Sequence, residues 1–88
     1  MVKLEKTIAQ YDLENGGFVV EVVEEKDYDD NKGEFVDLLL FYLFYKGYGE
    51  KIFLDFIPKT NNCNMEATIN NILARDNYIK WYRENIME

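Results

Sequence analysis

The sequence predicts an α+β domain in which a four-stranded antiparallel β-meander is followed by a C-terminal amphipathic helix, kinked or broken near Asp76 (ββββα). Two observations lead to this prediction. Up to residue 57, apolar side chains recur with the period of two that strands require, and short glycine-containing or acidic segments separate the runs. Beyond residue 60 they recur about every 3.6 residues, which is the period of a helix. A chain of 88 residues can bury one modest core, so we expect a single domain over residues 1–88.

The first two strands are expected at residues 3–13 and 17–26. Asn15-Gly16 lies between them, and both residues tolerate the positive φ angles of a type I′ turn. The dipeptide therefore predicts a tight hairpin.

The third and fourth strands are expected at residues 34–45 and 51–57, with a glycine-rich turn between them. Pro58 cannot donate a ladder hydrogen bond, so the fourth strand should stop there. In the third strand, FVDLLLFYLFY, both the odd and the even positions are mostly apolar. Such a strand is central and covered on both faces. Sheet curvature, the C-terminal segment or a second subunit must therefore shield the face that the helix leaves open.

The helix is expected to begin after Asn64, whose side chain can cap it. Its apolar stripe consists of Met65, Ile69, Ile72 and Leu73. Asp76 interrupts the stripe where an apolar residue is wanted, which predicts a kink or break. Beyond the break, Tyr78, Trp81 and Tyr82 form an aromatic cluster that we expect in the core, because the segment has helical spacing.

The net charge of the chain is −7, and its acidic excess lies in the first half. Residues 12–37 alone contain ten acidic side chains and two basic ones. This density repels a phosphate backbone instead of releasing its counterions, so we expect no direct binding to nucleic acid. A protein partner with a basic surface is favoured instead.

The most acidic stretch, DYDDNKGE at residues 27–34, invites comparison with a calcium-binding loop. Asp27, Asp29 and Asn31 match the first three ligand positions of an EF-hand. Lys32 stands where the turn needs glycine, and Leu38 stands where the bidentate glutamate is needed. We therefore expect no metal site and no cofactor, and a solvated hairpin tip is the simpler interpretation.

Catalytic groups are scarce, because the chain contains no histidine and no serine. Cys63 is the only thiol, and no base near it is evident in the sequence. We therefore expect that the protein is not an enzyme.

Three features favour a cytoplasmic protein without membrane contact. One cysteine cannot form an internal disulfide, whereas small secreted domains usually need several. Residues 1–10 carry charges and lack the apolar segment of a signal peptide. The longest apolar run, residues 35–45, is about half of the roughly 20 residues that a membrane-spanning helix needs.

The candidate partner-binding residues are the acidic side chains on both sides of the second turn and a tyrosine at the tip of the third turn. They are Glu21, Glu24, Glu25, Asp27, Asp29, Asp30, Glu34, Asp37 and Tyr48. Four of them, at positions 21, 25, 27 and 29, share strand parity, and alternate residues of a strand stand about 7 Å apart. This spacing predicts a row of carboxylates on one face.

In size, charge and lack of catalytic residues, the chain resembles phage-encoded inhibitors of host nucleases and immunity proteins that neutralise toxins. The first resemblance implies an anti-defence, nucleic-acid-mimicking inhibitor that blocks a basic nucleic-acid-binding protein or nuclease. The alternative is an immunity or adaptor protein that binds through an aromatic and apolar surface, with the acidic hairpin serving solubility. A homodimeric structural domain is a further alternative. Neither resemblance assigns a role to a particular residue.

Overall fold

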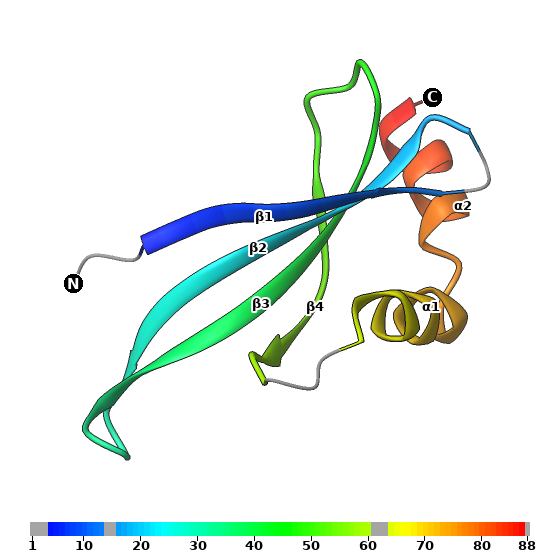
Figure 1. Cartoon of the computed structure of the whole chain (residues 1–88). Helices are drawn as coiled ribbons and strands as arrows, with labels where there is room; N and C mark the ends of the chain where they lie inside the picture. Colours follow the sequence, from blue (N-terminus) through cyan, green and yellow to red (C-terminus); the bar gives the residue numbers. More distant parts are fainter. Residues whose placement is uncertain (1–3, 14–15, 61–63, 88) are drawn as a thin grey trace.

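The computed structural model describes residues 4–13, 16–60 and 64–87. Four strands form one antiparallel sheet in sequential order: β1 (Leu4–Asp12), β2 (Phe18–Asp29), β3 (Glu34–Tyr45) and β4 (Ile52–Pro58). They are followed by α1 (Met65–Arg75), α2 (Tyr78–Tyr82) and a π-helical turn, η1 (Arg83–Met87), that continues α2. The predicted α+β class and the ββββα order are confirmed, and β4 ends at the proline as expected (Figure 1).

The pairing register decides which side chains share a face. β2 and β3 are paired without interruption over twelve positions, from Phe18 opposite Tyr45 to Asp29 opposite Glu34. The β1–β2 register shifts near residue 8, and the β3–β4 register shifts between residues 41 and 42. Because β2 is continuous, its even-numbered residues lie on one face of the sheet and its odd-numbered residues on the other.

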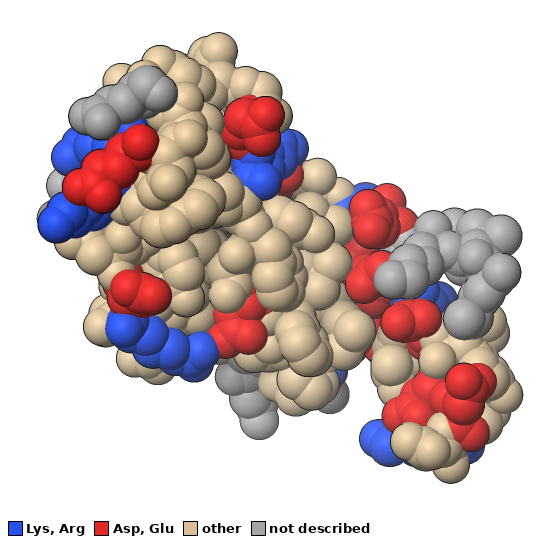
Figure 2. Space-filling view, turned by 180° about the vertical axis from the view of Figure 1, so that it is seen from behind, with Lys and Arg blue, Asp and Glu red and all other residues tan. Residues whose placement is uncertain are grey.

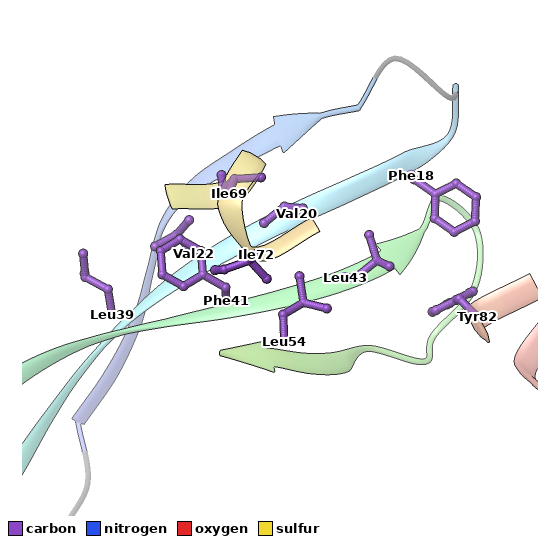
Figure 3. Close-up of a cluster of buried hydrophobic side chains, with 10 residues drawn as sticks. All are labelled: Phe18, Val20, Val22, Leu39, Phe41, Leu43, Leu54, Ile69, Ile72 and Tyr82. Carbon is purple, nitrogen blue, oxygen red and sulfur yellow. The ribbon is translucent and has the colours of Figure 1, made fainter. Parts of the chain in front are cut away.

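The core lies between the two helices and one face of the sheet. The side chains that form it are Phe18, Val20, Val22, Leu39, Phe41, Leu43, Leu54, Ile69, Ile72 and Tyr82. Figure 3 shows the two α1 isoleucines over β2 and β3, with Tyr82 of α2 close to Phe18 at the far end of the cluster. The rings of Phe18 and Tyr82 meet edge to face, with 5.6 Å between their centroids. Both helices therefore cover the same face of the sheet.

Local capping fixes the limits of the helices. The Asn64 side chain accepts a hydrogen bond from the Ala67 N–H at 3.0 Å and begins α1 as predicted. Asp76 has extended backbone angles and ends α1. Asn77 then caps α2 by accepting a hydrogen bond from the Lys80 N–H at 3.1 Å. The break predicted near Asp76 is confirmed.

The aromatic cluster of α2 is divided between core and surface. Tyr82 is fully buried, and its hydroxyl donates to the Glu50 carbonyl at 2.6 Å. Trp81 is 50% exposed, so its predicted place in the core is wrong. Successive helix positions point about 100° apart, and in so short a helix only one of the two can face the sheet.

Two sequence predictions concern residues outside the described ranges. These are the type of turn at Asn15-Gly16 and the environment of Cys63. Among the residues that the structure does describe, no helix is long and apolar enough to cross a membrane.

Candidate protein-binding site

The β2–β3 hairpin extends beyond both neighbouring strands. Within the described residues, the pairing of β1 with β2 ends at Lys26, and the pairing of β4 with β3 ends at Leu38. The hairpin continues past these points as a two-stranded ribbon, which projects away from the helices (Figure 1). We call residues 24–37 the acidic ribbon; its first three residues form the base, where β2 is still paired with β1.

The acidic ribbon concentrates charge of one sign. It carries seven acidic side chains and two basic ones. Figure 2 shows carboxylates gathered on this projecting end, whereas charged side chains are more scattered over the body of the molecule. The acidic excess in the first half of the sequence is therefore also concentrated at one end of the folded molecule.

The tip of the ribbon is an aspartate-stabilised turn. The Asp29 carboxylate accepts hydrogen bonds from the N–H groups of Asn31 at 2.9 Å and Lys32 at 3.3 Å. Gly33 has a φ of +67°, which a glycine adopts without strain, and its N–H donates to the Asp29 carbonyl at 2.8 Å. The turn therefore uses the Asp29 carboxylate to satisfy backbone N–H groups of its own residues.

Within residues 4–13, 16–60 and 64–87, no three acidic, histidine or cysteine side chains are grouped so that they could hold a metal ion.

Neutralisation by basic residues is confined to the base of the ribbon. Lys59 lies 3.1 Å from the Glu24 carboxylate, and Lys26 lies 4.0 Å from that of Asp37, too far for a hydrogen bond. Four acidic side chains nearer the tip have no basic partner among the described residues. They are Asp27, Asp29, Asp30 and Glu34.

The two faces of the ribbon differ in chemistry. Asp29 and Glu34 are directly opposite each other on one face, a like-charge pair that is unfavourable for folding. Tyr28 and Phe35 are paired on the other face, where their rings meet edge to face at 5.3 Å. These rings remain 37% and 60% exposed. The ribbon therefore presents carboxylates on one side and an exposed aromatic pair on the other.

Glu21, the first residue of the predicted carboxylate row, lies in the body of the sheet. It is 5% exposed, and its carboxylate accepts hydrogen bonds from Lys51 at 2.7 Å and Gln10 at 3.0 Å. The bond from Lys51 holds the pKa of this carboxyl below its usual value, although burial opposes the shift. Glu25 has the predicted parity and is also buried, at 5% exposure. The row therefore shares a face as expected, but it is exposed only towards the ribbon tip.

Tyr48 lies at the opposite end of β3 from the ribbon. It is 41% exposed at the β3–β4 turn, and its ring rests edge to face on Tyr45 at 5.7 Å. It lies in the turn where the sequence placed it, but it does not join the acidic residues in one surface. The candidate site is therefore the ribbon alone.

Comparison with protein-family models, with curated proteins and with solved structures gave no match.

Sequence reasoning missed two parts of this region. The Tyr28–Phe35 pair could have been found, because pairing a hairpin outward from its turn sets these residues opposite each other. The contact between Lys51 and Glu21 could not, because it spans three strands and depends on registers that the sequence does not specify.

Proposed function

We propose that this protein binds a partner with a basic surface through the acidic ribbon and thereby blocks that surface. The basic groove of a nucleic-acid-binding protein or nuclease is the surface whose chemistry fits best. The observation that carries the proposal is the ribbon itself. Its outer part, beyond Lys26, stands clear of the neighbouring strands, and its tip carboxylates have no basic partner among the described residues.

The carboxylates of the ribbon are closely spaced. Carboxylates two positions apart on a strand stand about 7 Å apart, and those on paired strands about 5 Å apart. Both distances are within the Debye length of about 8 Å in physiological salt, so the charges act together on an approaching cation. Basic side chains of a partner would also relieve the repulsion between Asp29 and Glu34.

The competing explanation is that the carboxylates keep the projecting hairpin soluble and prevent it from pairing with other strands. In that case the ribbon needs no partner.

Two variants of equal net charge distinguish the two explanations. The ribbon variant carries Asp27→Asn, Asp29→Asn, Asp30→Asn and Glu34→Gln, which preserve shape and acceptor oxygens. The control variant carries Glu5→Gln, Glu50→Gln, Glu66→Gln and Glu84→Gln, at exposed positions outside the ribbon.

The test is affinity capture from a lysate of the source organism, with duplex DNA added as a competitor. Wild type and the control variant should retain the same basic protein, and duplex DNA should release it. The ribbon variant should not retain it. The purified partner should then lose its nucleic-acid binding or cleavage when wild-type protein is added.

Retention of the same partner by the ribbon variant would contradict the proposal and place the contact on an aromatic surface such as that around Tyr48. Insensitivity to duplex DNA would show that the ribbon binds outside a nucleic-acid groove.

A further inference from the structure

A small pocket opens between α2 and the beginning of β4, at the end of the molecule remote from the acidic ribbon (Figure 1). Its volume is about 250 Å³, slightly below the roughly 300 Å³ at which pockets for drug-sized ligands begin. The pocket therefore has room for one small head group or side chain. The residues that line it are Ile52, Phe53, Asp76, Asn77, Tyr78 and Trp81.

Three of these residues are aromatic, and we call the site the aromatic pocket. Tyr78 and Trp81 are three positions apart on α2, a spacing that places both side chains on the same side of a helix. Phe53 comes from β4, where its ring meets that of Tyr42 edge to face at 5.6 Å. Phe53 and Trp81 are 51% and 50% exposed, so their rings are accessible to a ligand.

The aromatic pocket also contains one carboxylate, that of Asp76. Its Oδ1 accepts a hydrogen bond from the Asn77 N–H at 2.9 Å, which fixes the position of the side chain. Among the residues that the structure describes, no basic side chain forms an ion pair with it. The neighbouring Arg75 is instead bound to Asp55, at 2.5 Å. No described residue therefore compensates the negative charge of the pocket.

The cations of the described chain do not occupy the rings of the pocket either. Lys51 lies over the Phe44 ring at 5.3 Å, and Arg83 lies over the Phe18 ring at 5.4 Å. Neither contact uses a ring of the aromatic pocket. Aromatic faces attract cations through the negative charge of their π systems, and a carboxylate beside them adds to the attraction. The chemistry of the pocket therefore fits an organic cation.

We propose that the aromatic pocket binds an alkylated ammonium group, and a quaternary ammonium best of all. The alkyl groups of such an ion contact the rings, while its charge is attracted to Asp76 and to the ring faces. A lysine ammonium is compact and strongly hydrated, so it loses more on leaving water. An anion would be repelled by Asp76. Free quaternary amines and trimethylated lysine residues both carry the proposed group.

Trp81 is the only tryptophan of the chain, so its fluorescence reports on the pocket directly. Titration of the full chain with choline chloride up to about 30 mM should give a saturable change with a Kd on the order of 1 mM, because the pocket is small and open. Sodium chloride at the same concentrations should give no saturable change. This comparison corrects for the general attraction of cations to a chain of net charge −7. Dimethylbutanol, in which carbon replaces the nitrogen of choline, should bind at least tenfold more weakly.

Two substitutions test the two parts of the pocket. Asp76→Asn keeps an acceptor for the Asn77 N–H but removes the charge, and it should weaken choline binding at least fivefold. Phe53→Leu keeps an apolar wall but removes a ring, and it should weaken binding at least threefold. The matched controls are Asp30→Asn and Phe35→Leu, which make the same changes at exposed positions of the ribbon. Both should bind choline as wild type does, and circular dichroism should show all four variants folded.

A further titration distinguishes the two sources of the ammonium group. The probe is a short, otherwise uncharged peptide that contains one trimethyllysine. Binding at least tenfold tighter than that of choline would identify the ligand as a segment of a protein. Equal or weaker binding would identify it as a free small molecule.

The absence of a saturable response to choline up to about 30 mM would overturn the proposal. Equal binding of dimethylbutanol would also overturn it, because the pocket would then select apolar shape instead of charge. So would unchanged affinity in Asp76→Asn or in Phe53→Leu, because the choline would then be bound elsewhere. The ribbon variant should bind choline as wild type does, so the outcome does not depend on the proposed role of the ribbon.

Discussion

Among the acidic residues, Glu21 shows a clear difference between the environment that the sequence predicts and the environment in the structure. Its neighbours in sequence suggest one member of an exposed row, yet its carboxylate is buried and receives hydrogen bonds from Lys51 and Gln10. A buried carboxylate is tolerated only when such partners compensate for its lost hydration. Glu21 therefore serves the stability of the sheet, and it is omitted from the variant that tests the ribbon.

Replacing Lys51 with methionine should lower the free energy of unfolding by about 2 kcal/mol at neutral pH, because Glu21 then stays buried without its cation. The pairing lowers the pKa of Glu21 below the ordinary value of about 4.3. Its stabilisation is therefore complete above that value and is lost as pH falls through the lowered pKa. Urea unfolding at several pH values should show the difference from wild type shrinking below about pH 4.

Lys46→Met is the control for this prediction. Its ion pair with Asp12, at 3.2 Å, joins two exposed side chains, so its loss should cost at most about 1 kcal/mol. A Lys51→Met variant as stable as wild type at neutral pH would show that the pair contributes nothing to the fold.

The acidic ribbon is the element in which stability and binding conflict. Asp29 and Glu34 are directly opposite each other at its tip, and like charges in this position are destabilising. Something other than the stability of the isolated protein therefore accounts better for their presence, which agrees with a role in binding.

The substitution Glu34→Gln should raise the free energy of unfolding by about 0.2–1 kcal/mol at low salt, because it removes half of the repulsive pair. The gain should disappear at high salt, where the repulsion is already screened. Urea unfolding at low and high salt measures both effects. Glu50→Gln, which changes the net charge equally but is not in a strand, should show no such gain. Equal stabilisation by both variants would attribute the effect to net charge instead of the cross-strand pair.

The elements themselves were largely predictable because their signals are local. The proline that ends β4, the asparagine that caps α1 and the interruption at Asp76 each act on adjacent backbone groups. The exposure of single side chains was not predictable in the same way. Trp81 and Tyr82 are adjacent, and only the packing of α2 on the sheet decides which of them is buried. The sequence was enough to predict that the site is an acidic hairpin. It was not enough to predict which carboxylates of the hairpin lack a basic partner.

At the scale of the whole molecule, the charge is divided between an acidic end and a body of separate ion pairs. A phosphate backbone would meet mainly carboxylates at the projecting end. We therefore expect no binding to duplex or single-stranded nucleic acid at physiological salt. An electrophoretic mobility-shift titration tests this, with the ribbon variant as a comparison. A saturating shift by wild type at micromolar concentration would contradict both this expectation and the proposed mimicry.

Strands that follow one another in the sequence also lie next to one another in the sheet, in the order β1-β2-β3-β4. Each pairing therefore closes a short loop, such as the four residues between β2 and β3, and little chain entropy is lost before the ladder hydrogen bonds form. The bond from the Tyr82 hydroxyl to the Glu50 carbonyl joins residues 32 positions apart. We expect the hairpins to form early during folding and the helices to dock last. A nascent chain would then display its aromatic sheet faces before α1 and α2 are in place, and this is the stage at which it is most open to aggregation.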